Sequence, residues 1–309
     1  MKKVEVFILS GFLGSGKTTL LANLLSQEKK AGRSVAVLMN ELGQVSIDSN
    51  AITNDTPLKE LLGGCICCTI QGQFETSLHS ILQENSHLDA IYIETTGVAH
   101  PLEVLDACLS PLFAHQIIIQ GIVTLIDAKR WQERSGLSIR LQKLLKEQVI
   151  HADILLINKV DQLSDHEQAH LVFDIQSLNP NAKCLLTRYA AVQIDDIKIT
   201  RSQITPTHDL SHVEKDLHVK TYVHQFSIPL DIDIFEDWLR QMPESIYRIK
   251  GYLRFKHSVN TFLFQYSYGM PLYMKELMKY PMTVVFIGEN LDPSWMKIEM
   301  EKIEMESAK

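Results

Sequence analysis

The chain has 309 residues, an apolar fraction of 45% and a charged fraction of 22%, which are ordinary values for a soluble globular protein of about two domains. Its net charge of −7 and the lack of any basic run disfavour binding to nucleic acid or to an anionic membrane. No apolar stretch approaches the ~18 residues of a membrane span, and the first residues lead into a strand rather than a signal peptide. We therefore expect a cytoplasmic protein.

Short apolar strands alternate with amphipathic helical stretches up to about residue 190. The pattern predicts strands at residues 4–9, 34–39, 90–93, 121–126, 153–157 and 183–186, and helices at 17–30, 72–84, 102–109, 137–149 and 165–177. Nearly continuous apolar strands are typical of a parallel sheet that is covered on both faces. The sequence thus predicts a doubly wound, mostly parallel α/β domain, with ligands at the carboxyl ends of its strands.

Residues 11–19, Gly-Phe-Leu-Gly-Ser-Gly-Lys-Thr-Thr, match the phosphate-binding loop G-x-x-x-x-G-K-[ST] in full. The loop follows a predicted strand and precedes a predicted helix, which is the setting that the motif requires. Its N–H groups and the helix dipole would face phosphate oxygens, with Lys17 on the β- and γ-phosphates and Thr18 on Mg²⁺. The expected nucleotide-binding residues here are Gly11, Gly14, Ser15, Gly16, Lys17, Thr18 and Thr19.

Glu94-Thr95-Thr96-Gly97 follows the third predicted strand. Phosphate-loop enzymes place an acidic residue for Mg²⁺ here, and a glycine whose N–H group meets the γ-phosphate. We expect Glu94 to act on the metal or its waters and Gly97 to sense the terminal phosphate. With Lys17 and Thr18, Glu94 completes the predicted catalytic set.

Asn158-Lys159-Val160-Asp161 reads as the guanine-selecting N-K-x-D motif. The Asp161 carboxylate could accept two hydrogen bonds from guanine, a pattern that adenine does not offer, and the stem of Lys159 could lie along the base. The motif, with Asn158, therefore favours GTP and argues against the alternative of an ATP-driven kinase or ATPase.

Three of the five cysteines, Cys65, Cys67 and Cys68, lie within Gly63-Gly64-Cys65-Ile66-Cys67-Cys68. Thiolates at this spacing can converge on a soft or borderline cation, above all Zn²⁺, and three ligands leave a position open for exchange. The fourth ligand could be Glu41, a water molecule or the recipient protein. A redox dithiol and buried inert cysteines are the competing interpretations. The cluster ends a long polar stretch, residues 41–69, that has no convincing period and would suit a nucleotide-sensing switch.

A polar stretch at residues 201–220 is interpreted as a linker between a nucleotide-binding domain, residues 1–200, and a smaller α+β domain, residues 221–309. The second domain is expected to have strands at 221–228, 247–256, 260–267 and 282–287, with helices at 233–241 and from residue 293 onwards. Several histidines lie in or near the linker, and we interpret them as solvated more readily than as metal ligands: His208, His212, His218 and His224. Four further histidines and two lone cysteines are interpreted as ordinary core or surface residues: His79, His87, His151, His170, Cys108 and Cys184.

The combination of G-F-L-G-S-G-K-T-T-L, N-E-L-G, G-G-C-I-C-C-T, E-T-T-G and N-K-V-D resembles the CobW-type GTPases, a family that includes zinc metallochaperones and is related to nickel-delivery GTPases. Residues 247–251 and 284–288 are similar as well, so the resemblance covers most of the chain. It implies slow, Mg²⁺-dependent GTP hydrolysis, binding of Zn²⁺ or a similar divalent metal at the cysteine loop, and delivery of that metal to a client metalloprotein. By the same resemblance, Glu41 belongs to the first switch, and Glu94 and Gly97 to the second.

The chain departs from the family pattern at Gln44 and His100, where acidic residues are frequent, and in its few linker histidines. The resulting hypothesis is that GTP closes the 41–69 segment around the metal and that hydrolysis releases the ion, with reciprocal coupling between the two ligands. A nickel or cobalt chaperone and a GTP-dependent adaptor with little hydrolysis are the alternatives. Under any of these functions the protein could form a homo-oligomer.

Overall fold

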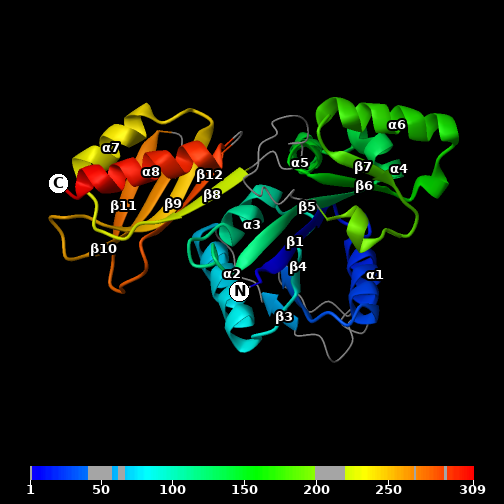
Figure 1. Cartoon of the computed structure of the whole chain (residues 1–309). Helices are drawn as coiled ribbons and strands as arrows, with labels where there is room; N and C mark the ends of the chain where they lie inside the picture. Colours follow the sequence, from blue (N-terminus) through cyan, green and yellow to red (C-terminus); the bar gives the residue numbers. More distant parts are fainter. Residues whose placement is uncertain (1, 41–57, 62–66, 199–219, 268, 289–290) are drawn as a thin grey trace. The chain divides into compact units, whose positions relative to one another are not determined.

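The computed structural model describes residues 2–40, 58–61, 67–198, 220–267, 269–288 and 291–309 (Figure 1). The chain divides into two compact units. One comprises Met1–Cys108 and Gln116–Leu217, and the other comprises Leu109–His115 and His218–Lys309. Within the described ranges, no helix is both long and apolar enough to cross a lipid bilayer.

The first unit is built on a parallel sheet that has seven strands among the described residues, in the order β3-β2-β4-β1-β5-β6-β7. The strands are β1 (Val4–Gly11), β2 (Val35–Asn40), β3 (Leu58–Leu61), β4 (Ala90–Glu94), β5 (Ile117–Asp127), β6 (Ile154–Asn158) and β7 (Lys183–Leu186). The chain moves to one side of β1 for β2 to β4 and to the other side for β5 to β7. Ligands of such sheets bind where the strand order reverses, which here is the carboxyl end of β1.

Helices cover both faces of this sheet. They are α1 (Lys17–Lys30), α2 (Cys67–Glu84), α3 (Pro101–Cys108), α4 (Ala128–Gln132), α5 (Ile139–Ile150) and α6 (Asp165–Leu178). Alternate residues of β6 enter two separate cores, because Leu156 packs with α1 residues and Leu155 packs with α5 and α6 residues. Burial on both faces explains why the strands are apolar without alternation. The predicted doubly wound α/β fold is confirmed.

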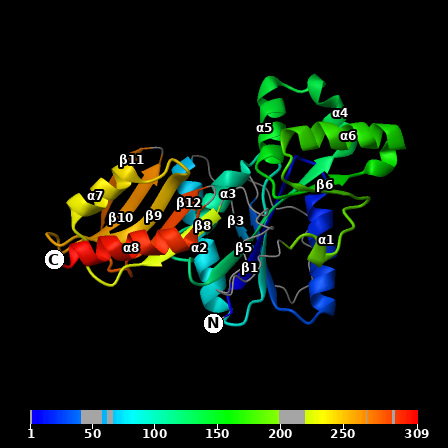
Figure 2. The same cartoon turned by 45° about the horizontal axis from the view of Figure 1, so that its top comes forward.

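The second unit has an antiparallel sheet, five-stranded in the part of the chain described, in the order β11-β10-β9-β12-β8. Its elements are β8 (Lys220–Gln225), α7 (Ile232–Gln241), β9 (Ile246–Arg254), β10 (Thr261–Ser267), β11 (Met270–Glu276), β12 (Thr283–Gly288) and α8 (Pro293–Ser307). Both helices pack on one face of the sheet, where Phe235 and Trp238 of α7 and Met296 and Met300 of α8 share one core (Figures 1 and 2). The predicted small α+β unit is therefore present.

Four elements differ from the predicted pattern. Strand β3 and the start of α2 at Cys67 lie inside the stretch 41–69 that showed no convincing period. Strand β11 and the short helix α4 were not predicted at all. Strand β3 has two charged residues among four, and β11 is an exposed edge strand that pairs with β10 alone among the described strands, so neither carries the apolar signal of a buried strand.

Candidate functional site

The loop between β1 and α1 turns through three glycines with positive φ, namely Gly11 (131°), Gly14 (75°) and Gly16 (111°). Two of them are also crowded. A Cβ on Gly11 would lie 2.3 Å from the carbonyl oxygen of Leu125, and a Cβ on Gly16 would lie 2.6 Å from Nδ2 of Asn158. Only glycine satisfies both the backbone and the space, so the loop has the tight form that the sequence motif requires.

Lys17 lies at the start of α1 with its ammonium inside the curve of the loop. Nζ donates hydrogen bonds to the carbonyl oxygens of Gly11 at 2.8 Å and Phe12 at 3.2 Å, and the residue is 7% exposed. Burial lowers the pKa of Lys17, and the nearby carboxylate of Glu94 opposes that shift. The buried ammonium and the N–H groups of the loop would together bind phosphate groups, whose negative charge would compensate the charge of Lys17.

Thr18 and Glu94 meet at the mouth of this loop. The Thr18 hydroxyl donates to Oε1 of Glu94 at 2.9 Å, and Glu94 is 8% exposed at the carboxyl end of β4. Close by in sequence, Oγ of Ser15 and Oγ1 of Thr95 are buried and have no hydrogen-bond partner among the described residues. The Thr18 hydroxyl and the Glu94 carboxylate form an oxygen pair that suits Mg²⁺ and its water shell.

Gly97 places the segment after β4 directly against the phosphate loop. A Cβ added at Gly97 would lie 2.5 Å from the backbone nitrogen of Leu13 and 2.6 Å from its Cγ. No side chain fits between the two segments. The predicted phosphate-sensing glycine is therefore next to the loop that is expected to hold the phosphates.

Asn158 ties the predicted guanine motif to the phosphate loop. Its Nδ2 donates to the carbonyl oxygen of Ser15 at 2.9 Å, and its Oδ1 accepts from the backbone nitrogen of Ala190 at 2.9 Å. The residue is 2% exposed. Asn158 thus joins three segments of the site to one another, and both of these groups bond to protein backbone.

Lys159 has a left-handed backbone (φ 62°), and its ammonium donates to the Gly14 carbonyl oxygen at 2.8 Å and lies 2.6 Å from Oδ2 of Asp127. Asp161 is exposed in the following short 3-10 helix, Val160–Gln162. Because the residue is exposed, its carboxylate is accessible to a base. Thr19 is likewise exposed in the first turn of α1.

Three residues of the site were not assigned a role from the sequence. Asp127 holds Lys159 and also caps α4 by accepting from the backbone nitrogen of Arg130. Arg130 donates from Nη1 to the Leu13 carbonyl oxygen at 3.1 Å and stacks 5.3 Å from the centroid of the Phe12 ring. Ala190 supplies the N–H group bonded to Asn158. Asp127 could have been identified from the sequence, because it directly follows a predicted strand. Arg130 and Ala190 could not, because they belong to no motif.

The predicted metal ligands are only partly placed. Cys67 and Cys68 are the first two residues of α2, so these two lie in a helical turn rather than in an open loop. Cys65 and Glu41 lie outside the described residues, as do the linker histidines His208, His212 and His218.

His224 is in β8, where its ring packs edge-on against Phe226 and burial lowers its pKa. Cys108 is buried and Cys184 is half-buried, as predicted for small core residues.

Two family models match the chain. The model for the CobW/HypB/UreG nucleotide-binding domain covers residues 5–186, and the model for the cobalamin synthesis protein CobW C-terminal domain covers residues 219–304. The first match includes the phosphate loop, the β4 end and the N-K-V-D motif that are described above.

Named relatives are similar along the same regions. The zinc chaperone YjiA of Escherichia coli is 28% identical over 286 residues, which is 86% of each chain. The zinc-regulated GTPase metalloprotein activator 1 of Schizosaccharomyces pombe is 34% identical over 209 residues, covering 63% of this chain and 47% of that one. The chain thus spans about half the length of this fungal relative. The crystal structure of Zn(II)-bound YjiA GTPase from E. coli aligns with a TM-score of 0.49 and 22% identity over 98% of this chain and 99% of that chain.

Proposed function

The chain belongs to the CobW/HypB/UreG family, and from this membership we propose that it is a GTP-hydrolysing metallochaperone that binds Zn²⁺, or a similar divalent metal, and delivers it to a client metalloprotein. The names of its relatives, zinc chaperones and zinc-regulated GTPase activators, support this function. The single observation that carries it is that the carboxyl end of β4 meets the phosphate loop and its helix at two points. Glu94 accepts a hydrogen bond from Thr18, and Gly97 lies close to Leu13.

GTP hydrolysis would depend on positioning and charge rather than on a general base. Lys17 would bind the β- and γ-phosphates, and Thr18 and Glu94 would hold Mg²⁺ and its waters. When bound, Mg²⁺ neutralises charge on the phosphates. The N–H group of Gly97 is assigned to the γ-phosphate, because this residue is close to Leu13 of the phosphate loop. With no base among the named residues, turnover of the isolated protein is expected to be slow.

Guanine selection is assigned to Asp161, whose exposed carboxylate can accept two hydrogen bonds from the base edge. Asn158 and Lys159 play a different part, because their polar groups bond to the phosphate loop, to Asp127 and to Ala190. They position the motif against the loop, so that base and phosphates are bound as one unit.

Metal binding is assigned to Cys65, Cys67 and Cys68, with Glu41 as the fourth ligand. The start of α2 at Cys67 supports this, because the positive end of a helix dipole and the free N–H groups of a first turn stabilise thiolates. Thiolates are the form that Zn²⁺ requires. A cytoplasmic location, which we infer as well, keeps such thiols reduced.

Two measurements on the whole protein test the enzymatic part of the proposal. Competition against a fluorescent guanine nucleotide should show displacement by GTP and GDP and none by ATP at the same concentration. Single-turnover phosphate release should show Mg²⁺-dependent hydrolysis that is lost in Lys17→Met. Displacement by ATP, or binding without any phosphate release, would contradict a GTPase.

The identity of the bound metal requires a separate measurement. Thiolate-rich sites bind several divalent ions, and affinity alone does not select among them. Zn²⁺, Ni²⁺ and Co²⁺ should therefore be compared at buffered concentrations for their effect on GTP turnover. Zn²⁺ acting at the lowest free concentration is the expected result, and a response confined to Ni²⁺ or Co²⁺ would favour the related insertion GTPases.

A further inference from the structure

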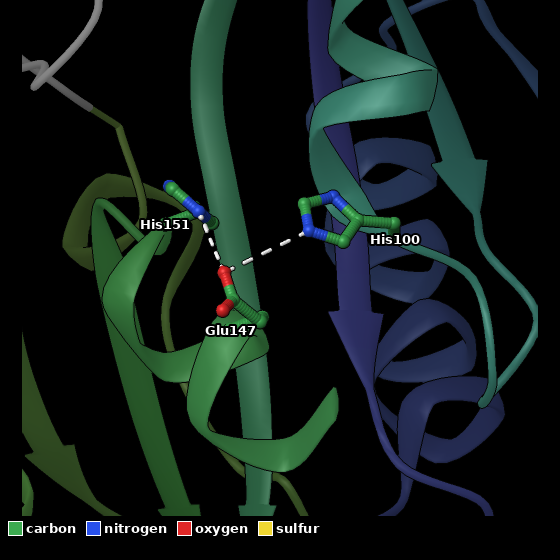
Figure 3. A group of neighbouring side chains, drawn as sticks. All are labelled: His100, Glu147 and His151. Carbon is green, nitrogen blue, oxygen red and sulfur yellow. Dashed lines mark hydrogen bonds and ion pairs between the residues drawn. The ribbon is translucent and has the colours of Figure 1, made fainter. Parts of the chain in front are cut away.

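A cluster of three metal-ligating side chains lies in the first unit and has no part in the nucleotide site. His100, Glu147 and His151 each offer one ligand atom, and these atoms lie within 4.8 Å of one another. Oε2 of Glu147 is 3.1 Å from Nε2 of His151 and 3.8 Å from Nε2 of His100. Figure 3 shows both imidazole rings directed at the same carboxylate.

The cluster joins two separate segments. Glu147 lies in the last turn of α5 and His151 is the C-cap residue of this helix, four positions later, so the two side chains lie on the same side. His100 comes from the turn before α3, where its carbonyl oxygen accepts from the backbone nitrogen of Glu103. A Glu–His pair on one helix is an ordinary ion pair, but the second imidazole reaches the same oxygen from 47 positions earlier in the chain.

The geometry is close to that of a zinc site. Tetrahedral Zn²⁺ with bonds of about 2.05 Å separates its ligand atoms by about 3.3 Å. The distances to Oε2, 3.1 Å and 3.8 Å, lie on either side of this value, and all three ligand atoms lie within 4.8 Å of one another. The side chains of His100, Glu147 and His151 are 33%, 30% and 28% exposed, which provides an entry path from solvent. Two imidazoles and one carboxylate form a borderline ligand set that leaves a fourth position for water.

We propose that His100, Glu147 and His151 form a second divalent-metal site, selective for Zn²⁺-like ions and separate from the cysteine loop. It requires no thiol. It therefore binds metal whether or not the cysteine loop does, and it can fail or succeed independently of the proposed chaperone function.

The site also bears on the nucleotide. Gln148, next to Glu147 on α5, is buried and donates at 3.3 Å to the carbonyl oxygens of both Gly97 and Ala99. An ion between α5 and His100 would add a stronger link at the end of this same segment, whose Gly97 packs on Leu13 of the phosphate loop. Metal in the second site thus restrains the segment that senses the γ-phosphate, and nucleotide and metal affinities should change together.

The experiment uses full-length protein with Cys65→Ser, Cys67→Ser and Cys68→Ser, so that thiol ligands are absent. Zn²⁺ binding is measured by competition with a chromophoric chelator in the presence of GDP. One bound ion is expected, and His151→Ala or Glu147→Gln in this background should weaken it at least about tenfold. His170→Ala is the matched control, since His170 is an exposed helical histidine of the same unit and should leave the affinity unchanged.

Co²⁺ substitution identifies the ligands and the segment they join. In the cysteine-free protein, the ligand-field bands should appear without a thiolate charge-transfer band and should disappear in His100→Ala. Equal melting temperatures in EDTA show that each variant is folded. The proposal is overturned if the cysteine-free protein binds no Zn²⁺, or if the His170 control weakens binding as much as the His151 variant does.

Discussion

The Thr18 hydroxyl donates a 2.9 Å hydrogen bond to Glu94, and this bond joins the first turn of α1 to the carboxyl end of β4. The two residues are 76 positions apart in the chain. In our account both act on Mg²⁺, so the ion would enter a site whose two protein groups are already side by side.

Glu94→Gln keeps the size of the side chain and removes its charge. We expect the rate of GTP hydrolysis to fall about 10²-fold and the Mg²⁺ concentration for half-maximal rate to rise, because the carboxylate acts on the metal and its waters. GDP affinity measured without Mg²⁺ should change little. Steady-state phosphate release across a Mg²⁺ titration tests this, with Glu103→Gln as an exposed acidic control. An unchanged Mg²⁺ response would remove Glu94 from the metal site.

Asp161→Asn should change the base that is bound. The amide has one donor where the carboxylate had an acceptor, so it mismatches guanine and matches xanthine, which carries a carbonyl in place of the exocyclic amine. We expect GDP affinity to fall about 10²-fold and the affinity for xanthosine diphosphate to rise. Equilibrium binding of both nucleotides measures the switch. Equal losses for both bases would show that the substitution only disturbs the motif.

Nucleotide affinity should decline at alkaline pH because of Lys17. Burial lowers the pKa of this lysine in the free protein, so its charge is lost at a lower pH than that of an ordinary lysine. Bound phosphates favour the charged form, and binding must therefore take up a proton once the free lysine is neutral. GDP affinity should therefore begin to decline at a pH below the ordinary lysine pKa of about 10.4. Equilibrium binding measured from pH 7 to about 10 tests this.

The guanine base also loses a proton in alkaline solution, and Lys17→Met isolates that contribution. The variant should bind GDP more weakly at neutral pH and should show a shallower pH dependence than the wild type. Parallel curves for the two proteins would mean that the base alone titrates and that the Lys17 prediction is wrong.

Gly97→Ala should disturb the nucleotide site through packing. The added methyl group would lie 2.5 Å from the backbone nitrogen of Leu13, and backbone cannot move aside cheaply. Overpacking of this kind costs about 1–3 kcal/mol, which we expect as a reduction of GTP-analogue affinity by about tenfold or more. Gly136→Ala is the control, because no described atom lies within 4 Å of its added Cβ. Matched affinities for the two variants would contradict the close approach at Gly97.

Much of the fold could be predicted because the first unit is built from strands buried on both faces. Their continuous apolar runs are distinctive, and the site motifs follow them directly. The missed strands lack this signal: β3 has the sequence Leu-Lys-Glu-Leu, and β11 contains Pro271 and forms a largely exposed edge. Such strands form because a neighbouring strand offers unpaired backbone groups, which a local sequence does not show.

The residues of the site likewise divide into those that the sequence identifies and those that only the folded structure brings together. Lys17, Thr18 and Glu94 could be found because each belongs to a motif with a known spacing. Arg130 could not, since its contacts with Leu13 and Phe12 arise only when α4 folds beside the loop. His151 was interpreted as an ordinary residue for a similar reason, because only the packing of α5 on the segment after β4 brings it close to His100.

The central claim is that the guanine nucleotide controls metal binding at the cysteine loop. The most direct test is anaerobic Zn²⁺ competition with the wild-type protein in GDP and in a non-hydrolysable GTP analogue, repeated with Cys67→Ser. We expect Zn²⁺ to bind about tenfold more tightly with the analogue, a coupling of about 1.4 kcal/mol, and we expect this difference to vanish on Cys67→Ser substitution in a His151→Ala background, which removes the second metal site. Equal Zn²⁺ affinity in the two nucleotide states of the wild type would contradict the account and leave a nucleotide hydrolase without a delivery cycle.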